Sequence, residues 1–252
     1  MLSKNTLKFI KSLHHKKFRK EEQSFFVEGG KSVTELLDSD YLVTHLLYTE
    51  KFAGEHPDYL RDFKGESYEV TANALEAAGL FQSNDSALAV ARFKSNEPFV
   101  AGEDEWVLGL DDVRDPGNLG TIIRIADWYG IKKIAMSQET ADLYNPKVLQ
   151  SSMGSFTRMR FFYTDLALFL QESKSPVYGA FLDGESLYGV DFPSAGILVM
   201  GNESNGISDQ ISRFIQHRVT IPKIGNAESL NVAVATAIIC DNIARLSARS
   251  KS

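Results

Sequence analysis

The sequence predicts a two-domain α/β protein whose larger, C-terminal domain is built on a mostly parallel sheet. Short strand-like and helix-like segments alternate through residues 24–93 and again from residue 106 onward, which is typical of α/β domains. The strand-like segments of the second half are apolar throughout, as expected for strands covered by helices on both faces. Residues 94–105 break the alternation with a proline, a glycine and a run of charge. We therefore expect domains over residues 1–95 and 106–252, joined by a linker over residues 96–105.

The first domain is expected to begin with an amphipathic helix within residues 1–20. Leu7, Ile10 and Leu13 recur there at helical spacing and would face a core. The glycines at 29 and 30 predict a turn between the first strand and the next helix. The expected strands are residues 24–27, 42–48, 68–70 and 86–93, and the expected helices are residues 33–37, 56–63 and 73–78.

The second domain repeats the alternation with longer helices. Residues 231–237 also fit a strand, because valine and alanine alternate in them, but the length of the segment and its alanines favour a helix. The expected strands are residues 106–110, 133–136, 161–163, 177–182, 197–200 and 219–221. The expected helices are residues 119–128, 146–151, 166–171, 209–215 and 232–246.

Composition excludes several classes of protein. Apolar residues make up 43% of the 252 residues and charged residues 24%, which is ordinary for a soluble globular protein. Cys240 is the one cysteine, so a disulfide scaffold is excluded, and a core thiol in a reducing compartment is expected. No apolar run reaches the length of a membrane span, and the lysine-rich N-terminus is not a secretory signal. We expect a cytoplasmic protein.

The charge is distributed unevenly along the chain. Residues 1–20 contain seven lysines and arginines and no acid, which is a charge of +7. Since the net charge of the whole chain is −6, the remaining residues sum to −13. A basic segment on an acidic body suggests contact with a polyanion such as RNA. The plainer interpretation is a solvated face of the helix, and both can hold together. The predicted RNA-contacting residues are Lys16, Lys17, Arg19 and Lys20.

The first of three segments rich in turn-forming and polar residues runs from Asp115 to Arg124. Pro116 and Gly117 predict a turn, and Asn118 is suited to cap the helix that follows. Gly120 would let another backbone or a ligand approach the first turn closely. Taken alone, the segment is explained as a strand-to-helix turn with a surface arginine.

The second segment, residues 198–207, is a buried strand that ends at Gly201 and passes into a polar loop containing Gly206. Such a loop at the carboxyl end of a parallel strand is where open α/β sheets bind ligands. It is neither a phosphate loop nor a dinucleotide fingerprint, because it has no Gly-Lys-Ser/Thr and no Gly-x-Gly-x-x-Gly.

The third segment, residues 221–235, contains a strand end at Pro222, a loop with Gly225, and Ser229 and Asn231 at the start of a helix. Backbone N–H groups at a helix start are free to donate to a ligand. The alternative is that Ser229 or Asn231 only caps the helix.

Together and in this order, the three segments resemble motifs 1, 2 and 3 of the SpoU-type (TrmH-like) RNA ribose 2′-O-methyltransferases of the SPOUT superfamily. The matching residues are Asn118, Gly120 and Arg124 for motif 1, Met200, Gly201, Asn202, Glu203 and Gly206 for motif 2, and Ile221, Pro222, Ser229, Leu230, Asn231 and Val232 for motif 3. The resemblance covers about residues 106–246. The first domain is similar to the ribosomal-protein-like substrate-binding domain that often precedes this domain, through Arg19, Phe26-Val-Glu-Gly29 and its α/β alternation.

The resemblance implies a SPOUT catalytic domain with a C-terminal trefoil knot, a homodimer, and methyl transfer from S-adenosyl-L-methionine to a ribose 2′-hydroxyl of RNA. The implied cofactor-binding residues are Gly201, Asn202, Ile221, Pro222 and Leu230. The implied catalytic residues are Arg124, Asn118, Glu203, Ser229 and Asn231.

Arg124 corresponds to the arginine that the family's proposed mechanisms sometimes draw as the general base. A guanidinium has a pKa above about 12 and is not deprotonated in proteins. We therefore expect Arg124 to orient the ribose and to stabilise developing alkoxide charge, on its own or the partner subunit's cofactor. Asn118 and Glu203 are expected to hold its guanidinium.

Three alternatives to this function are considered. A tRNA substrate is possible, but a separate substrate-binding domain favours 23S rRNA by family analogy. A non-catalytic RNA-binding module of the same fold is disfavoured by the intact motif residues. A nucleotide-dependent enzyme on a doubly wound sheet is disfavoured by the missing glycine and lysine motifs. No metal is expected, because the five histidines and Cys240 show no ligand spacing.

Overall fold

The protein divides into two compact units, in a computed structural model that describes residues 2–249. The first unit contains the described residues up to Ser95 together with Asp142–Thr157. The second contains Asn96–Ala141 and the described residues from Arg158 onward. That residues 142–157 fold with the first unit was not predicted, because the pattern of strands and helices continues unbroken around them.

The first unit is built on a four-stranded mixed sheet with the order β1-β4-β2-β3. Strand β4 is antiparallel to β1 and β2, whereas β2 and β3 are parallel. The strands are β1 (Ser24–Glu28), β2 (Val43–Tyr48), β3 (Glu66–Glu69) and β4 (Ala87–Arg92). The helices are α1 (Lys4–Ser12), α2 (Lys16–Glu22), α3 (Gly30–Leu37), α4 (Glu50–Glu55), α5 (Pro57–Asp62), α6 (Ala72–Ala78) and α8 (Pro146–Ser152), and a short 3-10 helix spans Ser155–Arg158.

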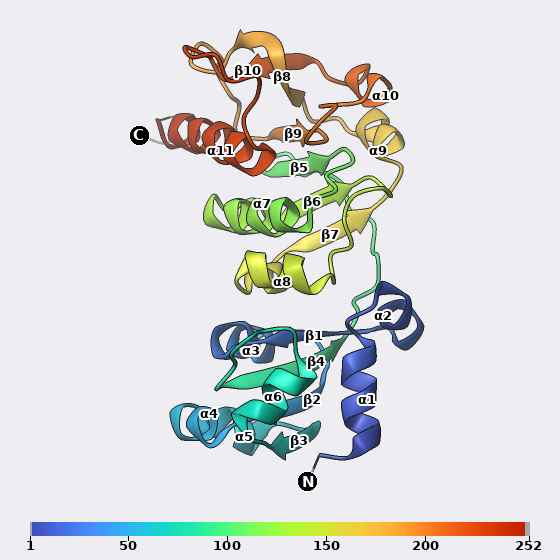
Figure 1. The fold of residues 1–252 in the computed structure, drawn as a ribbon. Coiled ribbons are helices and arrows are strands. Elements are labelled where there is room, and N and C mark those ends of the chain that lie inside the picture. Colours follow the sequence, from blue (N-terminus) through green and yellow to red (C-terminus); the bar gives the residue numbers. More distant parts are fainter. Residues whose placement is uncertain (1, 250–252) are drawn as a thin grey trace. The chain divides into compact units, whose positions relative to one another are not determined.

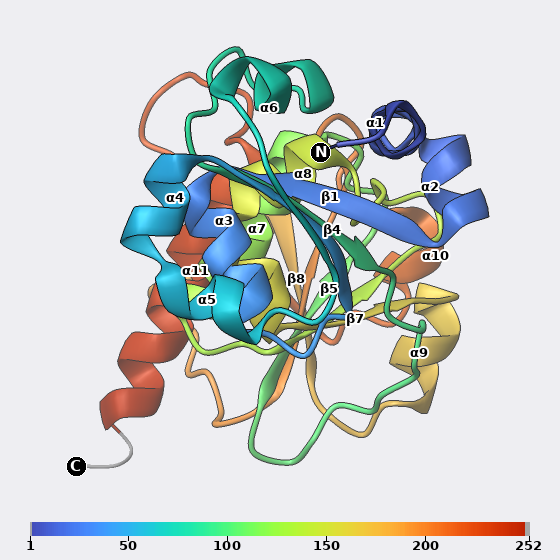
Figure 2. The same cartoon turned by 90° about the horizontal axis from the view of Figure 1, so that it is seen from below.

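Helices cover both faces of this sheet. Figure 2 shows α3, α4 and α5 on one face and α1, α2 and α6 on the other. The core under α1 and α6 includes Ile10, Leu13, Phe26 and Leu88, all nearly or completely inaccessible to solvent. The inward packing predicted for Ile10 and Leu13 is confirmed, although the N-terminal segment forms two helices separated near His14 rather than one.

Arg19 corrects one of the predicted RNA contacts. Its side chain is buried, with 2% of its surface exposed. One terminal nitrogen donates to the backbone carbonyls of Leu13 and His14, each at 3.0 Å, and the other donates to Asp142 Oδ2 at 2.7 Å. Because these donors point into the unit, the prediction that Arg19 contacts RNA is wrong. Arg19 instead joins α2 to the segment that begins at Asp142.

The second unit is built on a six-stranded sheet with the order β10-β8-β9-β5-β6-β7, and every pairing is parallel. Figure 1 shows α7 and α11 on one side of this sheet and α9 and α10 on the other. The predicted parallel sheet with both faces covered is therefore confirmed. The strands are β5 (Trp106–Leu110), β6 (Lys133–Met136), β7 (Arg160–Tyr163), β8 (Val177–Ser186), β9 (Gly196–Met200) and β10 (His217–Thr220). The helices are α7 (Pro116–Trp128), α9 (Leu166–Glu172), α10 (Asp209–Ser212) and α11 (Val232–Arg249).

Helix α7 begins earlier than the sequence suggested. Asp115 caps it by accepting the backbone N–H of Asn118 at 2.8 Å. Pro116 and Gly117 are its first residues rather than a separate turn, because proline is preferred where a helix starts and no backbone donor is needed. The prediction that Asn118 caps the helix is therefore wrong, and its side chain is free for another role.

The one cysteine lies in the interior of the second unit. Cys240 is buried on α11, and burial raises the pKa of its thiol to about 12. The predicted core role of this cysteine is confirmed. None of the helices in the described part of the chain has the length and hydropathy needed to cross a bilayer.

Candidate functional site

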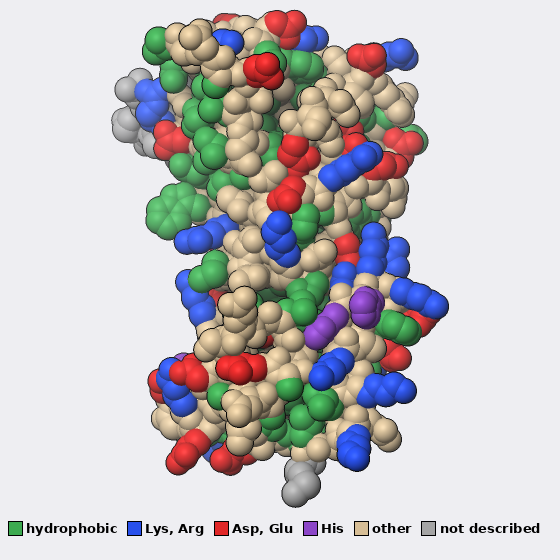
Figure 3. Space-filling view, in the orientation of Figure 1, with side chains coloured by type: hydrophobic (Ala, Val, Ile, Leu, Met, Phe, Trp, Pro, Cys, Tyr) green, Lys and Arg blue, Asp and Glu red, His purple; other side chains and the backbone are tan. Residues whose placement is uncertain are grey.

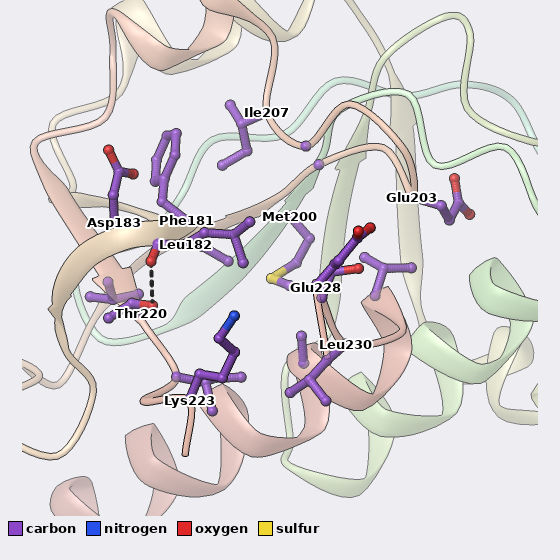
Figure 4. A pocket seen from close by; sticks show the side chains of 18 of the residues that line it. Phe181, Leu182, Asp183, Met200, Glu203, Ile207, Thr220, Lys223, Glu228 and Leu230 are labelled. Carbon is purple, nitrogen blue, oxygen red and sulfur yellow. Dashed lines mark hydrogen bonds between the residues drawn. The ribbon is translucent and has the colours of Figure 1, made fainter. Parts of the chain in front are cut away.

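The three motif segments meet at one edge of the parallel sheet of the second unit. Residues 111–115 follow β5, residues 201–207 follow β9 and residues 221–231 follow β10. The carboxyl ends of parallel strands lie at the same edge of a sheet, so these loops come together there. They border a cavity of about 620 Å³, lined by residues 180–183, 200–207, 219–225 and 227–230 and by the start of α11 (Figure 4).

The residues that the sequence assigned to the cofactor all lie in the lining of this cavity. They are Gly201, Asn202, Ile221, Pro222 and Leu230. Of the residues assigned to catalysis, Glu203 and Ser229 also line it, whereas Asn118, Arg124 and Asn231 do not. The volume is in the range of pockets that bind small molecules and cofactors.

The loop after β9 requires glycine at its first position. A Cβ atom on Gly201 would lie 2.1 Å from the carbonyl carbon of Gly206, which is part of the backbone and cannot move aside cheaply. Asn202 and Gly206 exchange two backbone hydrogen bonds of 2.9 Å, and Gly206 has a φ of +67°. The Asn202 side chain closes the turn by accepting the N–H of Ser204 at 2.9 Å. The backbone along this wall of the cavity is therefore fixed before any ligand binds.

A chain of side-chain hydrogen bonds joins the three motifs. Asn118 donates from Nδ2 to Glu203 Oε1 at 3.0 Å, and its Oδ1 accepts from Asn231 Nδ2 at 2.9 Å. Asn231 Oδ1 in turn accepts the N–H of Ala233 at 2.9 Å, at the start of α11. The side chain of Asn118 thus connects the loop after β9 with the start of the last helix.

Glu203 is held in its charged form. Its carboxylate accepts the backbone N–H groups of Arg114 at 3.2 Å and Asp115 at 3.1 Å in addition to the Asn118 amide. Burial by itself would raise the pKa of Glu203, but the hydrogen bonds from Asn118 and from the backbone outweigh it, and the pKa is lowered. A carboxylate with its oxygens already accepting from three donors is suited to fixing loops rather than to taking a proton.

Two aspartates after β5 support the same edge and were not predicted as site residues. The buried Asp111 accepts the N–H of Ser208 through Oδ2 at 2.7 Å. Asp112 has a φ of +60°, and its carbonyl accepts from Asn202 Nδ2 at 2.8 Å. A left-handed conformation is unfavourable for a residue other than glycine, so the hydrogen bonds around Asp112 must hold it. The sequence shows the two aspartates but not these partners.

Arg124 lies apart from the other motif residues. It is exposed on α7 and forms no hydrogen bond or ion pair with any residue in the described part of the chain. The expectation that Asn118 and Glu203 hold its guanidinium is wrong, because those two side chains bond to each other and to the neighbouring loops.

The cavity also contains side chains that the sequence analysis missed. Phe181, Leu182 and Asp183 come from the middle of β8, a strand that contains none of the three motifs. Their place follows from β8 lying between β9 and β10 in the sheet, an order that no local pattern predicts. Figure 4 shows Lys223 and Glu228 in the same cavity, both from the loop after β10.

The remaining basic residues predicted to contact RNA lie in the first unit. Lys16, Lys17 and Lys20 are exposed on α2. Phe18 lies among them with 39% of its surface exposed, and Lys17 Nζ is 5.8 Å from the centre of its ring. Figure 3 shows lysine, arginine and histidine side chains gathered over this part of the unit.

Models of two protein families match the two halves of the chain. Residues 105–241 match the SpoU rRNA Methylase family, and residues 4–89 match the MRM3-like substrate binding domain. The first match covers the cavity and all three motifs.

Individual proteins match over nearly the whole length. The 23S rRNA (guanosine(2553)-2′-O)-methyltransferase RlmP of Bacillus subtilis is 32% identical over 234 residues, which are 91% of this chain and 92% of that protein. The structure of a putative RNA methyltransferase of the TrmH family from Porphyromonas gingivalis is 39% identical, with a TM-score of 0.85, and the match covers 97% of this chain and 99% of that one. The AdoMet-bound rRNA methyltransferase from Sinorhizobium meliloti is 29% identical, with a TM-score of 0.87 and coverage of 97% and 96%. The parallel sheet, the three motifs at its edge and these matches agree, and the chain belongs to the SpoU rRNA methylase family.

Proposed function

We propose that this protein transfers a methyl group from S-adenosyl-L-methionine to a ribose 2′-hydroxyl of ribosomal RNA, with 23S rRNA as the substrate. The observation that carries the proposal is the hydrogen-bonded series Glu203–Asn118–Asn231, which joins the family's three motifs beside a cavity of cofactor size. The Bacillus subtilis relative is named for this reaction on 23S rRNA, and the Sinorhizobium meliloti structure contains AdoMet. A tRNA substrate is less well supported, because the first unit matches a substrate-binding domain shared with the rRNA enzyme.

The cavity has the chemistry that S-adenosylmethionine requires. Ile221 and Leu230 provide apolar surface, and the fixed backbone from Gly201 onward provides hydrogen-bonding groups for a purine edge. Carboxylates at Asp183, Glu203 and Glu228 suit a ligand that carries a sulfonium and an ammonium. We assign the cofactor to Gly201, Asn202, Ile221, Pro222 and Leu230.

When bound, the cofactor supplies a methyl group on a sulfonium, which is already an activated leaving group. The protein must therefore mainly position the 2′-hydroxyl for in-line attack. The guanidinium of Arg124 has no partner among the described residues, so it is free to bind the RNA backbone or the ribose oxygen and to stabilise the alkoxide that forms. Ser229, in the cavity lining, would contact the reacting groups.

Asn118, Glu203 and Asn231 act as positioning residues in this proposal. They hold the loop after β9 and the start of α11 in fixed positions, and both of these elements border the cavity. Glu203 is not the base, because its pKa is lowered and its oxygens are occupied by donors.

We also propose that the protein is a homodimer and that α7 and α11 form the interface. Trp128 on α7 has 83% of its surface exposed, and Val234 on α11 has 48%. Large apolar side chains this exposed on neighbouring helices are typical of a protein interface. Arg124 is exposed on the same helix, one turn before Trp128, so it would lie at this interface. The trefoil knot remains a prediction from the family resemblance.

The first unit would recognise the RNA through α2. Lys16, Lys17 and Lys20 provide phosphate contacts, and the exposed ring of Phe18 provides a surface on which an unpaired base can stack. Ribosomal RNA as the substrate also supports the cytoplasmic location expected from the sequence.

The test is methyl transfer to defined RNA by the purified protein. Incubation with methyl-labelled S-adenosylmethionine should label 23S rRNA and not tRNA, and mapping of 2′-O-methyl sites should find one ribose whose methylation depends on the gene. Cofactor binding without labelling of any RNA would instead indicate a non-catalytic RNA-binding module. Labelling confined to tRNA would contradict the assignment of the substrate.

A further inference from the structure

We infer that Lys223 binds the carboxylate of the methionine end of S-adenosylmethionine, and so selects ligands that carry a complete amino-acid group. This inference rests on the proposed function and adds a residue that the three motifs do not specify. Lys223 lies in the loop after β10, within motif 3, but between its matched residues Pro222 and Ser229.

The charged side chains of the cavity lining are mostly acidic. Among the described residues that line it, Lys223 is the only lysine or arginine, whereas Asp183, Glu203 and Glu228 are carboxylates. S-adenosylmethionine carries one carboxylate, one ammonium and one sulfonium. Within this lining, the carboxylate of the ligand has one ammonium available to it, that of Lys223.

The side chain of Lys223 is placed to reach a ligand in the cavity. Figure 4 shows Lys223 pointing from its loop into the cavity. Its ammonium forms no hydrogen bond or ion pair with any residue of the described chain, although Glu228 lines the same space. The ammonium can therefore pair with a ligand without first breaking a contact within the protein.

The three acids of the lining differ in their partners. The carboxylate of Glu203 is occupied by Asn118 and by backbone donors. The Asp183 carboxylate is paired with Arg218 at 2.7 Å. Glu228 has neither kind of partner among the described residues, so Lys223 and Glu228 together form an unpaired cation and anion suited to an amino-acid zwitterion.

The experiment compares two ligands by titration calorimetry, on the full-length protein and on its variants. S-adenosylmethionine and decarboxylated S-adenosylmethionine differ only in the carboxylate. We expect Lys223→Met to weaken binding of S-adenosylmethionine by about twofold to fivefold, the upper part of the range for an exposed charge pair. The same substitution should leave the affinity for the decarboxylated ligand unchanged or slightly higher.

The controls separate charge from shape. Lys223→Arg should keep most of the preference for the carboxylate, because it keeps the cation. Lys174→Met removes an exposed lysine that does not line the cavity and should change neither affinity. Raising the ionic strength should reduce the preference of the wild type towards that of the methionine variant.

Two results would overturn the inference: unchanged binding of S-adenosylmethionine by Lys223→Met, or equal weakening for both ligands, which would make Lys223 only part of the wall. Either result leaves the proposed function intact, provided the wild type binds S-adenosylmethionine. A wild-type protein that binds neither ligand would refute the proposed cofactor and the inference together.

Discussion

The side-chain amide of Asn231 donates to Asn118 Oδ1 at 2.9 Å, although 112 residues lie between them in the sequence. Each asparagine has a second partner: Asn118 donates to Glu203, and Asn231 accepts the N–H of Ala233 at the start of α11. An amide can donate and accept at once, and this property makes asparagine suited to joining three loops. The polar residues of the three motifs thus stabilise one another before they meet a ligand.

Replacing Asn118 with alanine should therefore affect both binding and turnover. The substitution leaves Glu203 without its side-chain donor and Asn231 without its acceptor, so we expect a loss of about 1–2 kcal/mol in the free energy of unfolding. Methyl transfer should fall by more than this loss of stability explains. The affinity for S-adenosylmethionine should also fall, because the loops that border the cavity are no longer held in position by Asn118. Urea unfolding, calorimetry and single-turnover methylation measure the three effects.

Thr121→Ala is the matched control for that variant. Thr121 lies one turn further along α7 and is exposed, and its hydroxyl donates to the carbonyl of Gly117 within its own helix. Full activity of Asn118→Ala, or an equal loss in Thr121→Ala, would show that the hydrogen-bonded series has no part in the reaction.

Glu203 should make stability depend on pH in the acidic range. Its pKa is lowered in the folded protein, so the unfolded chain binds a proton first as the pH falls. The contribution of Glu203 is then complete above its unfolded pKa of about 4.3 and is lost as the pH drops through the lower, folded value. Urea unfolding of wild type and Glu203→Gln from neutral to acidic pH should give a stability difference that shrinks below about pH 4. A difference independent of pH would contradict this assignment.

Arg124→Ala should abolish methyl transfer and leave cofactor affinity nearly unchanged. Arg124 does not line the cavity, and loss of a contact made in the transition state costs on the order of 3 kcal/mol or more. Arg124→Lys should restore activity only in part, because a point charge does not reproduce the planar guanidinium. Since Arg124 is exposed and has no partner among the described residues, the melting temperature should not change. Equal weakening of cofactor binding in the alanine variant would refute the role.

Replacing Lys16, Lys17 and Lys20 together with alanine should weaken RNA binding and reduce its salt dependence. Three lost phosphate contacts would make the slope of log K against log salt shallower by up to about 2, at roughly 0.7 per contact for single strands. Point substitutions are preferable to deleting residues 1–20, because Ile10, Leu13 and Arg19 are buried in the unit. Filter binding across a salt series measures the slope.

Arg19 provides the contrast for this experiment. Arg19→Met breaks a buried ion pair with Asp142 and should cost about 3 kcal/mol of stability, while changing the salt slope little in the protein that remains folded. An unchanged slope in the triple lysine variant would show that the RNA binds elsewhere.

Trp128→Glu should convert the proposed dimer to a monomer. The substitution places a charge where an exposed apolar ring is proposed to meet a second copy. Leu168→Glu is the control, because Leu168 is also exposed but lies on α9, on the other side of the sheet. Sedimentation equilibrium should give a monomer for the first variant and a dimer for the second. A wild-type monomer would refute the proposed interface.

Most of the local structure and the family of this protein could be predicted from its residues alone. The strands at residues 106–110 and 133–136 were predicted to the residue, because buried parallel strands are continuously apolar and end at polar residues. The motif residues indicated the loops that border the cavity, because backbone that packs closely against other backbone demands specific residues, as at Gly201. Leu13 and Ile10 could be assigned to the core from their spacing alone.

The partners of the polar side chains, by contrast, became apparent from the three-dimensional fold. From its charge, Arg19 was predicted to contact RNA together with the neighbouring lysines. Its burial and its ion pair with Asp142 depend on a segment that is distant in the sequence. The same holds for Asn118, whose role as a bridge depends on two loops that the order of the parallel strands brings together. Local patterns record which face of a helix or strand is apolar. The partners of a polar side chain depend on the packing of distant segments, which no local pattern contains.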